Sequence, residues 1–236
     1  DVFDALTTER VYKPAWSNAD AFQYLTDQRG ILFDPTCVDT LLDNRVIGLR
    51  NIRERSTFEI QATICRIVRD YFDSNDFNEM HTPKLLAEPT EGGAEVFTMD
   101  YFGKIATLAQ SPQFYKQMMV GVFERVYEIA PVYRAELSAT TRHMTEFTAI
   151  DAEMGFITLE DLKDVLSDIL HAVVDGVWEK HGAQLKQWNA TKPVLAEKIP
   201  TMSMAEIHEK YSAETGENSV GEKDLRPDEE RWICEY

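Results

Sequence analysis

The sequence has 236 residues, of which 44% are hydrophobic, and its formal net charge is −17. This composition excludes a disordered chain and allows one large domain or one domain with an appendage. The negative charge argues against non-specific nucleic-acid binding, because phosphate contacts depend on lysine and arginine. Since no stretch approaches the ~20 apolar residues of a membrane span, and the N-terminus lacks a signal-peptide pattern, we expect a cytoplasmic protein.

The three cysteines do not form a recognisable metal or redox motif. Cys37, Cys65 and Cys234 lie far apart and are odd in number. Zinc sites and dithiol motifs use closely spaced pairs. We therefore expect reduced thiols and no metal ligands among them.

The first 40 residues read as short helices separated by turns. After an opening helix from Asp1 to Glu9, Lys13-Pro14 interrupts the pattern. A further helix is predicted from Ser17 to about Asp27, and Asp34-Pro35 has the composition of a helix start. The sequence therefore predicts a small helical segment at the N-terminal end.

Two longer amphipathic helices are predicted further along the chain. Ser56-Thr57-Phe58-Glu59 has the spacing of a capping box and predicts the start of a helix of about five turns. Thr158 is the predicted cap of the second helix, which is expected to end before Gly182. Its apolar residues form one predicted stripe: Leu162, Val165, Leu166, Ile169, Val173, Val177 and Trp178.

Between these helices the pattern changes to short strands. The runs 96–99, 105–108 and 126–129 combine aromatic and β-branched residues and are separated by Gly, Pro or charged turns. Strands flanked by helices, without regular alternation of the two, indicate an α+β fold. We therefore expect an antiparallel sheet with flanking helices.

The segment from Tyr133 to Met154 carries the clearest chemistry. If it forms a hairpin, Arg134, Glu136 and Phe147 can share one face, with Arg142 and His143 near the loop. An arginine fork suits phosphate oxygens, a glutamate accepts from an exocyclic amine, and a phenylalanine stacks on a purine. The alternative is a solvated charged hairpin whose aromatic residue packs inward.

This segment resembles motif 2 of the class II aminoacyl-tRNA synthetases in its aspartate-specific form. Four other segments resemble parts of the same family in the expected order. They are the entry to the catalytic domain (Leu42–Arg50), the end of motif 1 (His81-Thr82-Pro83-Lys84), the mobile substrate-covering loop (Thr90–Phe97) and the amino-acid recognition strand (Leu108–Gln117).

The resemblance implies a role for each matching residue. Arg134 is the expected catalytic residue, contacting the ATP α-phosphate and the aspartate carboxylate. The implied ATP-binding residues are Arg134, Glu136, Arg142, His143 and Phe147, and the implied aspartate-binding residues are Glu91, Ser111, Gln113, Lys116 and Asp151. The charges agree, because an acidic amino acid needs a cation at its side chain and acceptors at its amine.

The family's reaction needs no protein nucleophile. Aspartate attacks the ATP α-phosphate to give aspartyl-adenylate, and a tRNA ribose hydroxyl then takes the aspartyl group. The resemblance implies ATP and Mg²⁺, a homodimer formed through the motif 1 region, and tRNA(Asp) as a partner. Whether tRNA(Asn) is also charged stays open, and so does asparagine as the substrate, although Lys116 favours aspartate.

Both ends of the chain depart from the family pattern. Motif 3 and the acidic metal ligands that precede it do not occur, so we expect residues 41–236 to be a partial catalytic domain. Residues 1–40 resemble the closing helices of an HD-GYP phosphodiesterase domain, without its HD and GYP motifs. A non-catalytic module that binds tRNA or ATP or forms dimers, and a phosphodiesterase fragment, are the alternative functions.

Overall fold

The computed structural model describes residues 6–8, 14–90, 96–136 and 144–235. The chain divides into two compact units, Asp1–Pro193 and Val194–Tyr236. Helices and short sheets are mixed in the larger unit, so the predicted α+β class is confirmed. Most of the helix expected from Asp1 to Glu9 lies outside the described residues.

The predicted helix starts near the N-terminus are confirmed. Helix α2 (Asn18–Asp27) begins after Ser17, whose hydroxyl accepts from the Asp20 amide at 3.1 Å. Helix α3 (Pro35–Asp43) begins after Asp34, whose carboxylate accepts from the Cys37 amide at 3.1 Å. The one-turn helix α4 (Arg45–Gly48) follows. Side-chain acceptors satisfy amides that have no partner in a helix's first turn, which is why both starts could be predicted.

Helix α5 (Ile52–Ser74) begins five residues before the predicted start. The cap is Asn51, whose side chain accepts from the Arg53 amide at 2.9 Å. Ser56 lies inside the helix, where its hydroxyl donates to the Arg53 carbonyl and accepts from the Trp188 indole at 3.0 Å. The prediction that Ser56 caps the helix was therefore wrong, because this serine binds a distant tryptophan.

Helix α7 (Leu159–Gln187) has the predicted capping box, formed by Thr158 and Asp161. It continues through Gly182 to Gln187, so the predicted end was wrong: a single glycine does not stop a helix whose next residues favour helix. The predicted single stripe is also divided. Val165, Ile169 and Val173 pack on the core, whereas Leu162 and Leu166 are exposed.

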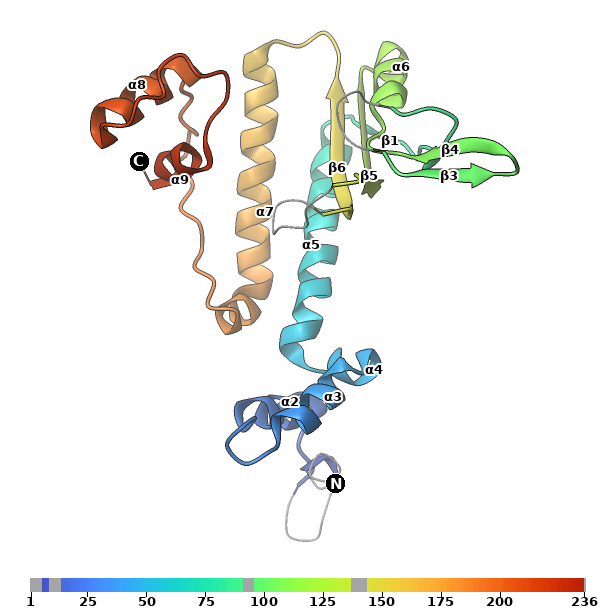
Figure 1. The fold of residues 1–236 in the computed structure, drawn as a ribbon, viewed down its shortest axis with the longest axis vertical. Coiled ribbons are helices and arrows are strands. Elements are labelled where there is room, and N and C mark those ends of the chain that lie inside the picture. The colour runs from blue at the N-terminus through green and yellow to red at the C-terminus, as the bar shows by residue number, and fades with distance from the viewer. Residues whose placement is uncertain (1–5, 9–13, 91–95, 137–143, 236) are drawn as a thin grey trace. The chain divides into compact units, whose positions relative to one another are not determined.

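The core of the larger unit is an aromatic cluster between the helices and the sheet. It contains Val68, Phe72, Phe77 and Tyr127. The Phe72 ring lies 4.6 Å from that of Tyr127 and 4.7 Å from that of Phe77. Burial, together with hydrogen bonds from its hydroxyl to Asp73 and Glu79, raises the pKa of Tyr127. Helix α5 packs against α7 beside this cluster (Figure 1).

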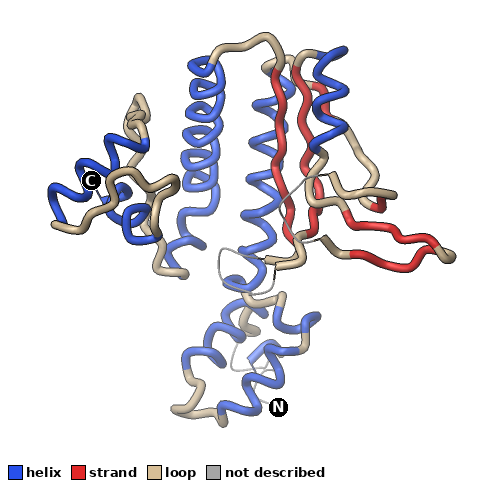
Figure 2. Tube along the Cα trace, turned by 45° about the horizontal axis from the view of Figure 1, so that its top comes forward, coloured by secondary structure: helices blue, strands red, loops and turns tan. Residues whose placement is uncertain are grey.

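The strands form two separate three-stranded sheets. In the first, β1 (Asn78–Glu79) pairs in parallel with β5 (Arg125–Tyr133), and β5 pairs antiparallel with β6 (Glu146–Met154). In the second, β4 (Lys104–Leu108) pairs with β2 (Leu85–Leu86) and β3 (Thr98–Tyr101). The predicted strands are thus confirmed, but one pairing is parallel and the sheet is split (Figure 2).

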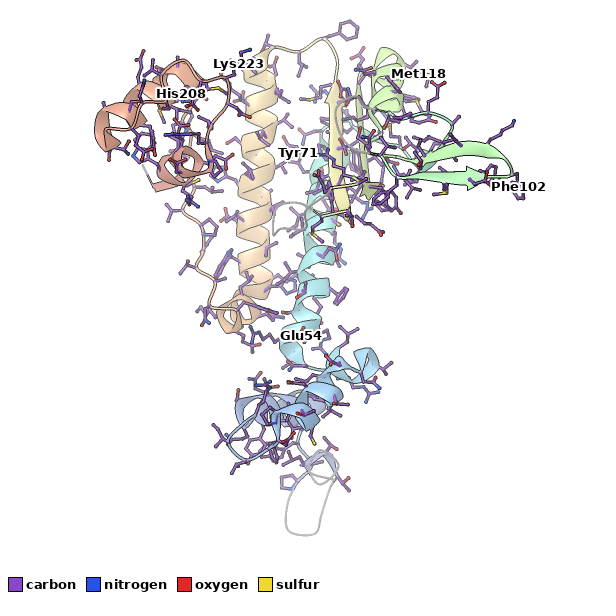
Figure 3. All side chains as sticks on the ribbon, in the orientation of Figure 1. Glu54, Tyr71, Phe102, Met118, His208 and Lys223 are labelled. Atoms are coloured by element: carbon purple, nitrogen blue, oxygen red, sulfur yellow. The ribbon has the colours of Figure 1, made fainter. Side chains whose placement is uncertain are left out.

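A tight turn joins β3 to β4. Phe102 and Gly103 both have positive φ, 53° and 77°, as a two-residue hairpin turn requires. Such a φ is strained for phenylalanine and easy for glycine. The Phe102 side chain is 91% exposed at the tip of the hairpin (Figure 3).

The smaller unit is built on a buried histidine–glutamate pair. Helix α8 (Met204–Thr215) carries His208, whose Nδ1 lies 2.8 Å from Glu229 of α9 (Pro227–Glu235). Both side chains are buried. Burial opposes ionisation of Glu229, but bonds from the Arg226 amide, Ser219 and His208 lower its pKa to about 2. Glu229 thus joins both helices as a carboxylate.

Within the described ranges, none of the helices combines the length and the apolar character needed to cross a bilayer.

Truncating the core aromatic tests the packing of the larger unit. Phe72→Ala removes a ring that contacts both Phe77 and Tyr127, so we expect a loss of about 3–5 kcal/mol of unfolding free energy in urea. Phe58→Ala is the control on the same helix. Because Phe58 is 55% exposed, its change should stay within about 0.5 kcal/mol. Equal effects of the two substitutions would contradict the described core.

The pKa of Glu229 predicts a pH dependence of the smaller unit. A carboxyl whose folded pKa lies below its ordinary value of 4.5 stabilises the fold above that pH, and this stability is lost as the pH falls toward 2. Thermal unfolding of wild type and Glu229→Gln should therefore differ most at neutral pH and converge on acidification. A difference in melting temperature that stayed constant with pH would disprove the assignment.

Candidate active site

The register of β5 and β6 sets which side chains share a face. Nine residue pairs run from Arg125↔Met154 to Tyr133↔Glu146. Side chains alternate along a strand, so Phe147, Asp151 and Glu153 lie on one face of β6. This is the face opposite to that of the core residue Met154. Helix α6 (Gln113–Phe123) contacts both strands, and it lies on the side of the sheet away from α5 and α7 (Figure 2).

Lys116 of α6 is held by two carboxylates of this face. Its Nζ lies 2.9 Å from Oδ1 of Asp151 and 3.6 Å from Oε2 of Glu153. The lysine side chain is only 7% exposed. A buried ammonium needs a charged partner, and Asp151 and Glu153 provide two for Lys116.

A second ion pair lies next to the first. Glu128 is directly opposite Asp151 across the strands. Its carboxylate accepts from the Thr82 amide at 2.6 Å and from the Lys84 Nζ at 2.7 Å. Glu128 is buried, and it attaches the segment after β1 to β5. Lysine and carboxylate groups therefore alternate across this face of the sheet.

The opposite end of the face carries Arg134 and Phe147. The Arg134 guanidinium carbon lies 5.7 Å from the centre of the Phe147 ring, within reach of a cation–π interaction. The Arg134 amide donates to the Thr145 carbonyl at 3.0 Å, and the Glu136 amide donates to the Arg134 carbonyl at 2.8 Å. Nε of Arg134 is buried and has no hydrogen-bond partner in the described part of the chain. The Arg134 and Phe147 side chains thus lie together; that the Glu136 side chain joins them on this face stays a prediction.

Ser111 and Gln113 lie where β4 leads into α6. The Ser111 hydroxyl accepts from the Gln113 amide at 3.2 Å. Just before them, the Ala109 amide donates to the Lys84 carbonyl at 3.0 Å, and its carbonyl accepts from the Tyr133 amide at 2.9 Å. Ala109 therefore connects the two sheets just before α6 begins.

The structure differs from the sequence prediction in two respects here. The expected recognition strand, Leu108–Gln117, ends as a strand at Leu108, and Lys116 is helical. Glu153 was not predicted, although the spacing Asp151-x-Glu153 places both carboxylates on one strand face. Glu91, Arg142 and His143 lie outside the described residues.

Two other features bear on what the site can bind. Among the residues that the structure describes, no group of three or more His, Cys, Asp or Glu could hold a metal ion. A shallow pocket of about 440 Å³ lies at the end of the hairpin. It is lined by Gln61, Pro131, Met144, Glu146, Phe147 and Thr148, and the residues around Lys116 are not among them.

Comparison with known proteins identifies the family. Residues 38–236 match the model of the tRNA synthetases class II (D, K and N). The chain belongs to this family. The five segments that resemble synthetase motifs lie within the matched range, so the predicted family is confirmed.

Several relatives of this class II synthetase chain carry aspartate–tRNA ligase names. It is 40% identical to the aspartate–tRNA(Asp/Asn) ligase of Deinococcus radiodurans over 201 residues, which are 84% of this chain and 46% of that protein. It is 43% identical to the ligase of the same name from Thermus thermophilus over 199 residues, covering 84% of this chain and 47% of that one. The chain therefore spans about half the length of these relatives.

Solved synthetase structures share the fold. The asparaginyl-tRNA synthetase of Pyrococcus horikoshii, complexed with asparaginyl-adenylate, has a TM-score of 0.73 at 28% identity, covering 84% of this chain and 46% of that one. The aspartyl tRNA synthetase of Entamoeba histolytica has a TM-score of 0.66 at 28% identity, covering 98% and 44%. These comparisons do not support the expected resemblance of residues 1–40 to an HD-GYP domain.

A double-mutant cycle tests the ion pair between Lys116 and Asp151. Lys116→Met leaves Asp151 and Glu153 without their cation, and we expect a loss of roughly 1–3 kcal/mol, because both carboxylates keep some contact with water. Adding Asp151→Asn should recover part of this loss in urea unfolding. Lys163→Met, at an exposed pair, is the control and should change stability by less than about 0.5 kcal/mol. Strict additivity of the two changes would show that Lys116 and Asp151 do not interact.

Proposed function

We propose that this chain performs the amino-acid activation of an aspartate–tRNA ligase. The observation that carries the proposal is the shared face of the β5–β6 hairpin, with Lys116 at one end and Arg134 with Phe147 at the other. A cation for an acidic side chain and a cation beside an aromatic ring suit an amino acid and a nucleotide placed end to end. The names of the bacterial relatives agree with this function.

In the aspartate half of the proposed site, Lys116 meets the substrate's side-chain carboxylate. Asp151 and Glu91 face its ammonium group, and Ser111 and Gln113 line the remaining side. Lysine carries three donors, and Asp151 takes one of them, so donors remain for a substrate. Asparagine would leave the ammonium of Lys116 without the negative partner that aspartate brings, which favours aspartate.

In the nucleotide half, Arg134 binds the α-phosphate and Phe147 stacks on the adenine. The buried and unpartnered Nε of Arg134, among the described residues, supports an anion at this position. Glu136 accepts from the adenine amine, and Arg142 and His143 bind the β- and γ-phosphates. ATP is used together with Mg²⁺, for which the described residues offer no ligand cluster.

The reaction follows from this placement. A carboxylate oxygen of aspartate attacks the α-phosphorus in line, the bond to the β-phosphate bridging oxygen breaks, and pyrophosphate leaves. Arg134 stabilises the charge that develops on the α-phosphate oxygens. A ribose hydroxyl of tRNA(Asp) then attacks the carbonyl of aspartyl-adenylate and releases AMP; tRNA(Asn) is a second candidate acceptor. Catalysis rests on positioning rather than on a protein nucleophile.

The proposal also covers the parts of the chain, its assembly as a dimer and its place in the cell. Residues 41–236 form the synthetase part, and residues 1–40 are a helical segment that precedes it, in line with a family match that begins at residue 38. A homodimer forms through the motif 1 region, which comprises α5 and the His81–Lys84 segment. The protein works in the cytoplasm, where ATP and tRNA are available.

Amino-acid-dependent exchange between ATP and pyrophosphate tests the function. Aspartate should support exchange, whereas asparagine and lysine, the other substrates implied by the family description, should not. Lys116→Met should lower kcat/KM for aspartate by about 100-fold, because the substrate carboxylate loses its cation in a buried site.

Lys163→Met, at an exposed pair on α7, is the matched control and should leave exchange unchanged. Equal exchange with asparagine, or no exchange with aspartate, would refute the aspartate assignment. Binding of ATP and aspartate without exchange would instead identify a non-catalytic module.

A further inference from the structure

Glu153 is a carboxylate of the hairpin face to which the synthetase resemblance gives no role. It lies two residues after Asp151 on β6, so both side chains point to the same side of the sheet. Its Oε2 is 3.6 Å from the Nζ of Lys116. Across the hairpin it is paired with Val126, an apolar residue, so β5 provides no cation opposite it.

The charges around Lys116 are unbalanced. Lys116 carries one positive charge and meets two carboxylates, so this triad has a formal charge of −1. The neighbouring Glu128 does not draw on Lys116, because Lys84 neutralises it at 2.7 Å. An ammonium on a flexible four-carbon stem would swing around a single partner, whereas two carboxylates on one strand hold it from two directions.

We propose that Glu153 is a positioning residue that acts through Lys116. Together with Asp151 it holds the Nζ of Lys116 over β6, so that a donor of the ammonium that Asp151 does not use points toward the substrate's side-chain carboxylate. Its use in aspartate recognition rests on the proposed function, but the hold on Lys116 does not.

Such an arrangement lowers the cost of binding because the lysine need not be ordered when the substrate arrives. The triad's surplus negative charge also attracts the substrate ammonium, which favours the zwitterionic amino acid over a plain dicarboxylate. Glu153 itself is 32% exposed and keeps contact with water, so its removal should not by itself unfold the chain.

The experiment compares Glu153→Gln with Glu146→Gln, a change of the same kind on the same strand but on its other face. The acetylation rate of Lys116, measured by mass spectrometry relative to Lys163, reports how firmly the ammonium is held. Affinities for L-aspartate, L-asparagine and succinate, measured by calorimetry, report the effect on recognition.

We expect Glu153→Gln to raise Lys116 acetylation several-fold and to weaken aspartate binding by about 10-fold. This size is typical of the interaction energy between two residues in contact, here Glu153 and Lys116. Asparagine binding, which does not use the ammonium of Lys116, should change much less. The aspartate preference over succinate should shrink. Glu146→Gln should leave all of these values unchanged.

An unchanged Lys116 acetylation rate in folded Glu153→Gln would overturn the proposal, and so would faster acetylation with unaltered aspartate affinity. Equal weakening of aspartate and asparagine would show that Glu153 contacts the substrate ammonium instead. If the wild type binds no aspartate, the proposed function fails, and acetylation alone decides whether Glu153 holds Lys116.

If Glu153→Gln melts at a far lower temperature than Glu146→Gln, Glu153→Asp is used in its place. This variant withdraws the charge by one methylene and should raise acetylation by about 3-fold.

Discussion

The antiparallel register of β5 and β6 is the constraint on which both the core and the candidate site depend. Because side chains alternate, one register assigns Tyr127 and Met154 to the packed face and Glu128, Asp151 and Glu153 to the other. A shift by one residue would exchange the two sets and bury carboxylates against Phe72. The aromatic cluster therefore stabilises the arrangement of charges on the opposite face, although it does not touch it.

The carboxylates of the charged face are paired with two cations, which come from two different segments. Lys84 comes from the loop after β1, and Lys116 comes from α6. Burying a carboxylate or an ammonium without a partner costs free energy. The loop with Lys84 and the helix with Lys116 must therefore both be in place for the charged face to be stable. These ion pairs thus hold the loop and the helix against the strands.

Local features of the sequence could be predicted and long-range choices could not. Ser17, Asp34 and Thr158 cap helices through contacts within three residues, which the sequence contains in full. Asn51 and Ser56 are both good caps, and the indole of Trp188, far along the chain, decides between them. Likewise Asp151-x-Glu153 indicates a strand face, but only the folded chain brings Lys116 to it.

Ala109 is a small residue with a mechanical consequence. Its amide donates to the Lys84 carbonyl, next to β2, and its carbonyl accepts from the Tyr133 amide, so the second of these hydrogen bonds joins the β2–β4–β3 sheet to the end of β5. Arg134 is the next residue after Tyr133. A displacement of the exposed β3–β4 hairpin therefore has a direct path along β4 and through the Tyr133–Ala109 hydrogen bond to the backbone that carries the arginine.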